Sequence, residues 1–282
     1  MVRATDSGAG CGDSWPRCEG HIIPVSASGA TLVEFTHRAM TFILGVLLIA
    51  MVVIVFRRYA KGEPVRRALG WSVGFFFGEV LIGAALVLFG WVEDDASVAR
   101  VVAVSVHLVN TFLLLGALTL TAHLASGGRA PDLSADRTRT RSVLTGVVAL
   151  LIVGASGALN ALADTLGDGA APWLLYELRV FHPLIAIAGG GLLLMLTQTR
   201  MFAGGGPSEG TVARLRRSVQ VTIAVQFAAG FLNIALLTPV ETQVLHLLLA
   251  DVLWILWVRL GAESLSVPAT PTPIAERRAV AA

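Results

Sequence analysis

The chain is poor in charged residues, and this shortage decides its class. Only 14% of its 282 residues are Asp, Glu, Lys or Arg, whereas 55% are hydrophobic and the mean hydropathy is +0.75. Soluble domains carry roughly 25% charged residues, so the composition excludes an ordinary soluble protein and indicates an integral membrane protein. The formal net charge of +2 is small and gives no indication of a nucleic acid partner.

Cysteine is also scarce: the chain has two, Cys11 and Cys18. Both lie in the stretch CGDSWPRC near the amino terminus. Their close spacing favours a disulfide if this segment faces an oxidising exterior. Two free thiols and a metal-binding pair are the alternatives, and the lack of a second cysteine pair disfavours the metal.

Long apolar runs, in contrast, are abundant. A helix needs about 20 apolar residues to cross a bilayer, and seven segments of the chain meet this requirement: 30–56, 69–92, 99–124, 142–166, 174–199, 212–238 and 240–262. These runs are continuous and do not alternate with polar residues, which excludes a transmembrane β-barrel. We therefore predict an all-α, multi-pass membrane protein with seven transmembrane helices.

The loops between these segments differ in charge. The loops around residues 57–67, 129–141 and 200–217 are rich in arginine, whereas those around 93–100 and 164–179 carry most of the loop aspartates. In proteins of the cell membrane the cytoplasmic loops are the basic ones. This places residues 1–29 on the extracytoplasmic side and the tail 263–282 in the cytoplasm. The tail is rich in Pro, Thr and Ala, and we expect it to be disordered. Residues 1–29 contain no signal sequence. Either the first helix inserts unaided with this segment outside, or an upstream helix is missing from this chain, and we favour the missing helix.

The chain reads as two similar halves, 30–124 and 142–262, joined by a polar, basic cytoplasmic linker at 125–141. Each half has a histidine in its first descending helix, a polar residue followed four positions later by glycine in the ascending helix, and a histidine in its last helix. The matching residues are His37 and His182, Glu79 with Gly83 and Gln226 with Gly230, and His107 and His246. Shared landmarks at this spacing indicate an internal duplication. Only the second half has a further helix before its first histidine, which again predicts a missing first helix.

The four repeated histidines are the strongest functional signal. Each lies a few residues inside the external end of an apolar segment, where a histidine is costly and usually has a function. Haem iron in helical bundles is commonly held by two imidazoles from facing helices, and the carboxylates or thiolates that other metals require are sparse here. We predict that His37, His107, His182 and His246 are axial ligands of two haem irons. The alternative is that each forms a hydrogen bond to a neighbouring helix.

Charged residues near the histidines are further candidates. Glu34 lies three residues before His37, on the same face of a helix, where its carboxyl group would relay protons or stabilise positive charge; the alternative is a side chain that extends to the membrane surface. Arg38 and Arg179 lie at the same external level and would either pair with haem propionates or serve as interfacial anchors. Glu79 lies deep in its span, and the sequence does not identify its partner.

At these residues the chain resembles a known family. The stretch CGDSWPRCEGHIIP followed by LVEFTHR is similar to the first external loop and second helix of haem A synthases, and LRVFHPLIA around His182 is similar to a later helix. The resemblance covers about residues 3–262. It implies eight helices in two pseudo-symmetric four-helix bundles, of which this chain would contain seven.

The resemblance also implies an activity. Haem A synthases are membrane oxidoreductases that convert haem O to haem A for cytochrome oxidase, by successive oxygen-dependent hydroxylations of the C8 methyl group and loss of water to give a formyl group. Haem O synthase and cytochrome oxidase assembly factors would be partners. Membrane lipids would surround the helices, and the resemblance allows either a monomer or a homo-oligomer.

Individual roles follow from the same resemblance. His182 and His246 would ligate the iron of a resident haem b, and His37 and His107 would hold the substrate haem. Glu34 would be the catalytic carboxylate. The disulfide between Cys11 and Cys18 would lie over the substrate half and could mediate electron entry.

Two other functions use the same residues. A non-enzymatic, di-haem electron carrier of the cytochrome b type would need the four histidines but neither Glu34 nor the cysteines. A transporter with repeated halves would use the histidines as proton relays and would bind no haem. The haem content of the purified protein therefore separates the transporter from the other two functions.

Overall fold

The computed structural model of the protein describes residues 2–26, 28–92, 95, 97–170, 173–198 and 209–266. These residues form seven helices, in chain order α1 (Gly29–Arg58), α2 (Pro64–Leu88), α3 (Val98–Ala125), α4 (Arg137–Ala170), α5 (Trp173–Gln198), α6 (Glu209–Ala235) and α7 (Val240–Leu265). All seven are long and apolar enough to cross a membrane. This confirms the predicted all-α membrane class, and the described ranges contain no β-strand, only an isolated bridge between Cys18 and His21.

Polar caps determine where the helices begin. The hydroxyl of Ser28 accepts a hydrogen bond from the Thr31 amide at 3.1 Å and caps α1, in the usual manner of a serine at this position. α2 begins at Pro64, whose fixed φ suits the first helical position, and not at the expected residue 69. It ends at Leu88, earlier than the expected residue 92, and Gly90 follows with φ of +66°.

Two further boundaries differ from the prediction because hydropathy marks the apolar span and not the helix. α4 begins at Arg137, inside the predicted linker 125–141, because the side chain of Asp136 accepts hydrogen bonds from the amides of the next turn. α7 continues to Leu265, into the predicted tail, where Arg139 donates a hydrogen bond to the Ser264 carbonyl at 2.7 Å. The rest of the predicted disordered tail, 267–282, lies outside the described residues.

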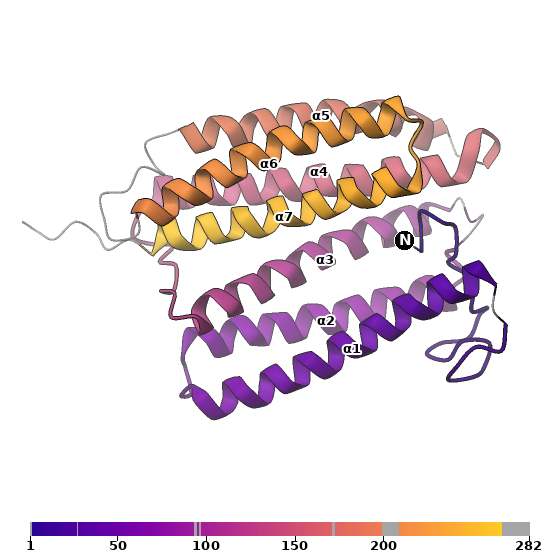
Figure 1. Ribbon diagram of the computed structural model, residues 1–282, viewed down its shortest axis with the longest axis horizontal. Helices are drawn as coiled ribbons and strands as arrows, with labels where there is room; N and C mark the ends of the chain where they lie inside the picture. Colours follow the sequence, from indigo (N-terminus) through magenta and orange to yellow (C-terminus); the bar gives the residue numbers. More distant parts are fainter. Residues whose placement is uncertain are drawn as a thin grey trace, which may run out of the picture.

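The helices run side by side with their long axes roughly aligned (Figure 1). In the first half α2 packs along α3, and in the second half α4 packs along α5 and α6 along α7. α3 joins the halves through contacts with α4 and α7, where Phe112 stacks on Trp254 with ring centroids 5.4 Å apart. The largest buried cluster includes both of these rings and belongs mainly to the second half.

Because successive helices alternate in direction, α1, α3, α5 and α7 all begin at the same end of the bundle. His37 is the ninth residue of α1, His107 the tenth of α3, His182 the tenth of α5 and His246 the seventh of α7. The rise of about 1.5 Å per residue in a helix therefore puts the four histidines at similar depths below one end of the molecule.

Candidate functional site: a cavity lined by four histidines

The four repeated histidines line one cavity of about 1860 Å³ that lies between both halves of the protein. Most ligand pockets have volumes of about 300–1,000 Å³, so this cavity has room for two large ligands. Its walls are mainly apolar, and the polar groups converge near the ends of the helices where α1, α3, α5 and α7 begin.

The two histidine rings of the second half lie at about the spacing that two imidazoles on one metal ion would have. The rings of His182 and His246 have centroids 6.5 Å apart and planes at 89°. Two metal–imidazole bonds of about 2 Å each, together with the two rings, span roughly 6 Å. One ring is also oriented from outside the pair, because Nδ1 of His182 lies 2.9 Å from the hydroxyl of Ser156 on α4, which leaves Nε2 for a ligand.

Two glycines let these rings approach the neighbouring helices. A Cβ atom at Gly157 would lie 3.1 Å from Cε1 of His182, and one at Gly230 would lie 3.2 Å from Cε1 of His246. Both distances are tighter than nine in ten real contacts of a Cβ atom, so each ring would have to shift by a few tenths of an ångström. The absence of a side chain at both positions therefore lets the two rings lie where they do.

The histidine pair of the first half has different surroundings. His37 is exposed toward the cavity, whereas His107 is partly buried. Nδ1 of His107 lies 3.6 Å from Oε1 of Glu79 on α2. The carboxylate of Glu79 also accepts hydrogen bonds from Asn110 at 2.6 Å and from Thr111 at 2.5 Å. The structure thus supplies the partners of Glu79 that the sequence did not identify.

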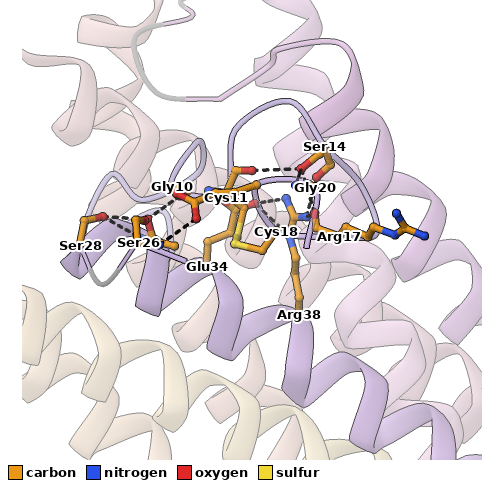
Figure 2. Close-up of a disulfide and its surroundings, with 12 residues drawn as sticks. Gly10, Cys11, Ser14, Arg17, Cys18, Gly20, Ser26, Ser28, Glu34 and Arg38 are labelled. Atoms are coloured by element: carbon orange, nitrogen blue, oxygen red, sulfur yellow. Dashed lines mark hydrogen bonds and ion pairs between the residues drawn. A yellow bond between two sulfur atoms is a disulfide. The ribbon is translucent and has the colours of Figure 1, made fainter. Parts of the chain in front are cut away.

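Glu34 lines the cavity one helical turn before His37 and is buried, with 3% of its surface exposed. Its Oε2 accepts a hydrogen bond from the Cys11 amide at 2.7 Å, and its Oε1 accepts one from Nε of Arg38 at 3.1 Å and another from Nη2. Figure 2 shows both side chains reaching from α1 to the cysteine loop. Glu34 is therefore buried beneath the cysteine loop.

Arg38 connects the same helix to the loop at two more points. Its Nη1 donates hydrogen bonds to the carbonyl oxygens of Ser14 and Arg17, at 2.7 and 2.6 Å. The loop is closed by a disulfide between Cys11 and Cys18, both almost fully buried. The guanidinium of Arg38 thus binds the loop in this structure, and its contact with a haem propionate stays a prediction. The side chain of Arg179 lies outside the described part of the chain.

Two further arginines at the cavity wall were missed by sequence reasoning. Arg3 donates hydrogen bonds to the Ala161 carbonyl and, at 3.3 Å, to Gln243, so the amino-terminal segment contacts the second half. Arg100 is 4% exposed and donates to the Asp95 carbonyl at 2.9 Å. An arginine in the first turn of an apolar helix was the available signal for Arg100.

The other two histidines do not line the cavity. His21 forms the backbone bridge with Cys18, and His123 lies near the opposite end, with Nε2 3.1 Å from the Arg129 carbonyl and Nδ1 3.7 Å from Glu263. Within the described ranges, no group of three His, Cys, Asp or Glu side chains converges to hold a free metal ion.

The chain is similar in sequence to several known proteins. A family model described as cytochrome oxidase assembly protein matches residues 1–168. A "Protoheme IX farnesyltransferase" of Thermus thermophilus is 41% identical over 276 residues, which are 94% of this chain and 45% of the relative. A "Heme A synthase" of an Exiguobacterium species is 27% identical over 199 residues, 70% of this chain and 64% of the relative.

A "Heme A synthase" of Lysinibacillus sphaericus is 38% identical over 91 residues, 32% of this chain and 29% of the relative. The chain thus spans less than half the length of the Thermus thermophilus proteins that it matches. No solved structure matches it.

Proposed function

Because the chain belongs to the haem A synthase family of cytochrome oxidase assembly proteins, we propose that it oxidises the C8 methyl group of haem O to a formyl group and so produces haem A. The observation that carries this proposal is the shared cavity of about 1860 Å³, which is lined by a histidine pair from each half. Such a cavity holds a substrate haem and a second haem within one protein.

The second-half pair fits a resident haem b. The spacing of 6.5 Å between the rings of His182 and His246 suits two axial ligands on one iron, and haem b bound there would supply one-electron transfer. Ser156 orients one of the two rings. Gly157 on α4 and Gly230 on α6 let the rings of His182 and His246 lie close to these neighbouring helices.

We place the substrate haem O at His37 and His107, because this half also contains the buried carboxylate of Glu34. Its two oxygens are held by Arg38 and by the Cys11 amide, so the carboxylate has a fixed position in the cavity wall. A fixed anion stabilises positive charge that develops on a nearby substrate without reorganising during the reaction. We therefore assign Glu34 as the catalytic carboxylate.

The disulfide loop covers the external end of the first half in our proposal. Arginine-rich loops lie at the opposite end of the helices from the four histidines, and the positive-inside rule makes that end cytoplasmic in the plasma membrane. The site then opens toward the extracytoplasmic surface, where a disulfide between Cys11 and Cys18 is chemically stable.

A protohaem farnesyltransferase is the partner that fits this substrate. The Thermus thermophilus relative with that name matches 94% of this chain, and 55% of the relative lies outside the match. We infer that this chain receives haem O from an activity of that class, and that it works with cytochrome oxidase assembly factors.

The test is the absorption spectrum and the extracted haem content of the purified protein, expressed with and without haem O synthase. We expect haem b in both preparations and haem A only when haem O is supplied. Replacing His182 or His246 by Ala should remove haem b, and Glu34→Ala should lead to accumulation of haem O. Haem b without haem A in every preparation would instead indicate a di-haem electron carrier, and a protein without haem would refute both functions.

A further inference from the structure

The duplicated halves differ at one position next to the last histidine of each half. Glu79 is nine residues from the end of α2, and Gln226 is nine residues from the end of α6. Each is followed four residues later by a glycine that faces a histidine of the next helix, Gly83 facing His107 and Gly230 facing His246. The carboxylate and the amide therefore occupy equivalent places in the two halves.

In the first half the carboxylate is held as an acceptor. Asn110 and Thr111 donate hydrogen bonds to its two oxygens at 2.6 and 2.5 Å, and Asn110 also donates to the Phe75 carbonyl at 2.8 Å. The remaining near neighbour is Nδ1 of His107, 3.6 Å from Oε1 of Glu79. This separation is longer than a hydrogen bond, and Nδ1 of His107 is buried without a hydrogen-bond partner among the described residues. The carboxylate therefore lies beside this ring nitrogen without bonding to it.

In the second half the polarity is reversed. The side-chain NH₂ group of Gln226 lies 3.3 Å from Nε2 of His246 and donates to the His246 carbonyl at 3.1 Å. The neighbour of His246 is thus at Nε2 and not at Nδ1 as in His107, and Nδ1 of His246, which is buried without a hydrogen-bond partner among the described residues, is the nitrogen left for a ligand. The positions that correspond to Asn110 and Thr111, counted from the histidine, are Leu249 and Ala250, which have no polar side chain. The carboxylate and its two donors therefore occur together in the first half and are replaced together in the second.

An acceptor beside the outer nitrogen of a ligating histidine fixes the orientation of the ring and increases its donor strength toward the metal. We propose that Glu79 is a positioning residue that orients His107 and strengthens its bond to haem iron, and that the Glu79/Gln226 difference makes the two haem sites chemically unequal. This inference rests on the proposed binding of one haem in each half. The stronger ligand stabilises oxidised iron, so Glu79 lowers the reduction potential of the first-half haem.

The experiment uses the full chain and measures each haem separately. Replacing His182 and His246 by Ala leaves the first-half haem, and replacing His37 and His107 by Ala leaves the second-half haem. In these backgrounds we compare Glu79→Gln, which gives the first half the residue of the second, with Gln226→Glu, which does the reverse. The measurements are the midpoint potential, the electron paramagnetic resonance spectrum of the ferric haem and its dissociation rate.

We expect Glu79→Gln to raise the potential of the first-half haem, to change its ferric spectrum and to increase its dissociation about tenfold or more, the usual effect of losing such a partner. Gln226→Glu should lower the potential of the second-half haem. The matched control is Glu263→Gln, because Glu263 also lies beside a histidine, His123 at 3.7 Å, but away from the cavity. This control should leave both haems unchanged.

The inference is overturned if Glu79→Gln leaves the first-half haem unchanged, or if it shifts both haems equally, as a general packing defect would. If Glu79→Gln does not assemble, the Gln226→Glu titration decides: a lowered potential supports the inference and an unchanged one overturns it. A wild-type chain that binds no haem in its first half even when haem O is supplied would refute the proposed function itself. The two failures are therefore distinguishable.

Discussion

The replacement Glu34→Ala tests how the cysteine loop is held over the cavity. The carboxylate accepts three hydrogen bonds, one from the Cys11 amide and two from Arg38, and it does so in a buried place where 4% of its side chain is exposed. Alanine would leave the Cys11 amide without an acceptor at a residue that is fully buried. It would also leave Arg38, 13% exposed, without its anionic partner.

The size of the effect follows from these contacts. A hydrogen bond to a charged group contributes about 1.5–3 kcal/mol, and removal of one partner of a buried ion pair costs about 3–5 kcal/mol. Because Arg38 keeps its bonds to the Ser14 and Arg17 carbonyls, we take the lower end, about 3 kcal/mol, for loop docking. Each 1.36 kcal/mol is a factor of ten, so the loop should open roughly 100-fold more often.

Hydrogen exchange of the Cys11 amide measures this opening in the purified, oxidised protein. The matched control is Glu19→Ala, which removes an exposed carboxylate of the same loop that accepts bonds from the amides of Val25 and Ser26. The control should leave the Cys11 amide as protected as in the wild type. Equal protection of Cys11 in Glu34→Ala and wild type would refute the assigned role of this contact.

Three other outcomes are expected. Gly230→Ala should reduce second-half haem occupancy several-fold, since its Cβ would lie 3.2 Å from a histidine ring, whereas Gly83→Ala, with 3.9 Å to the corresponding ring, should not change first-half occupancy. Gly146→Ala would place Cβ 1.9 Å from a buried tryptophan ring; overpacking costs about 1–3 kcal/mol and should lower the Tm in detergent. Hydrogen bonds from Ser26 hold the pKa of Glu19 below its ordinary value of 4.5. The contact between Glu19 and Ser26 is therefore intact above pH 4.5 and is lost as the pH falls through the lowered pKa. The Ser26 amide resonance should accordingly titrate below pH 4.5.

Several features of the protein could be predicted from local sequence. The seven spans follow from run length and hydropathy, because an apolar helix in a bilayer must satisfy its own backbone hydrogen bonds. The common depth of the four histidines follows from their position in alternating spans. Helix ends were predicted less well, as at Pro64 and Arg137, because capping and proline geometry decide them and hydropathy does not.

The partners of the polar residues could not be predicted in this way. Glu34 and Glu79 both looked like intramembrane carboxylates, yet one binds the cysteine loop and the other faces His107. The partner of each carboxylate depends on how its helix is rotated about its axis and on which neighbour the helix meets. Glu34 and Cys11 are 23 positions apart along the chain, and Glu79 and His107 are 28 positions apart.

By itself the sequence determined the membrane class, the number of spans, the repeated histidines and the place of the cysteines, because these depend on composition and on spacing within single helices. Only the tertiary structure decided that both histidine pairs share one cavity, that Arg38 holds the disulfide loop, and that a carboxylate faces one histidine while an amide faces its counterpart. These features arise from the packing of one helix against another, where a small rotation exchanges one neighbour for the next.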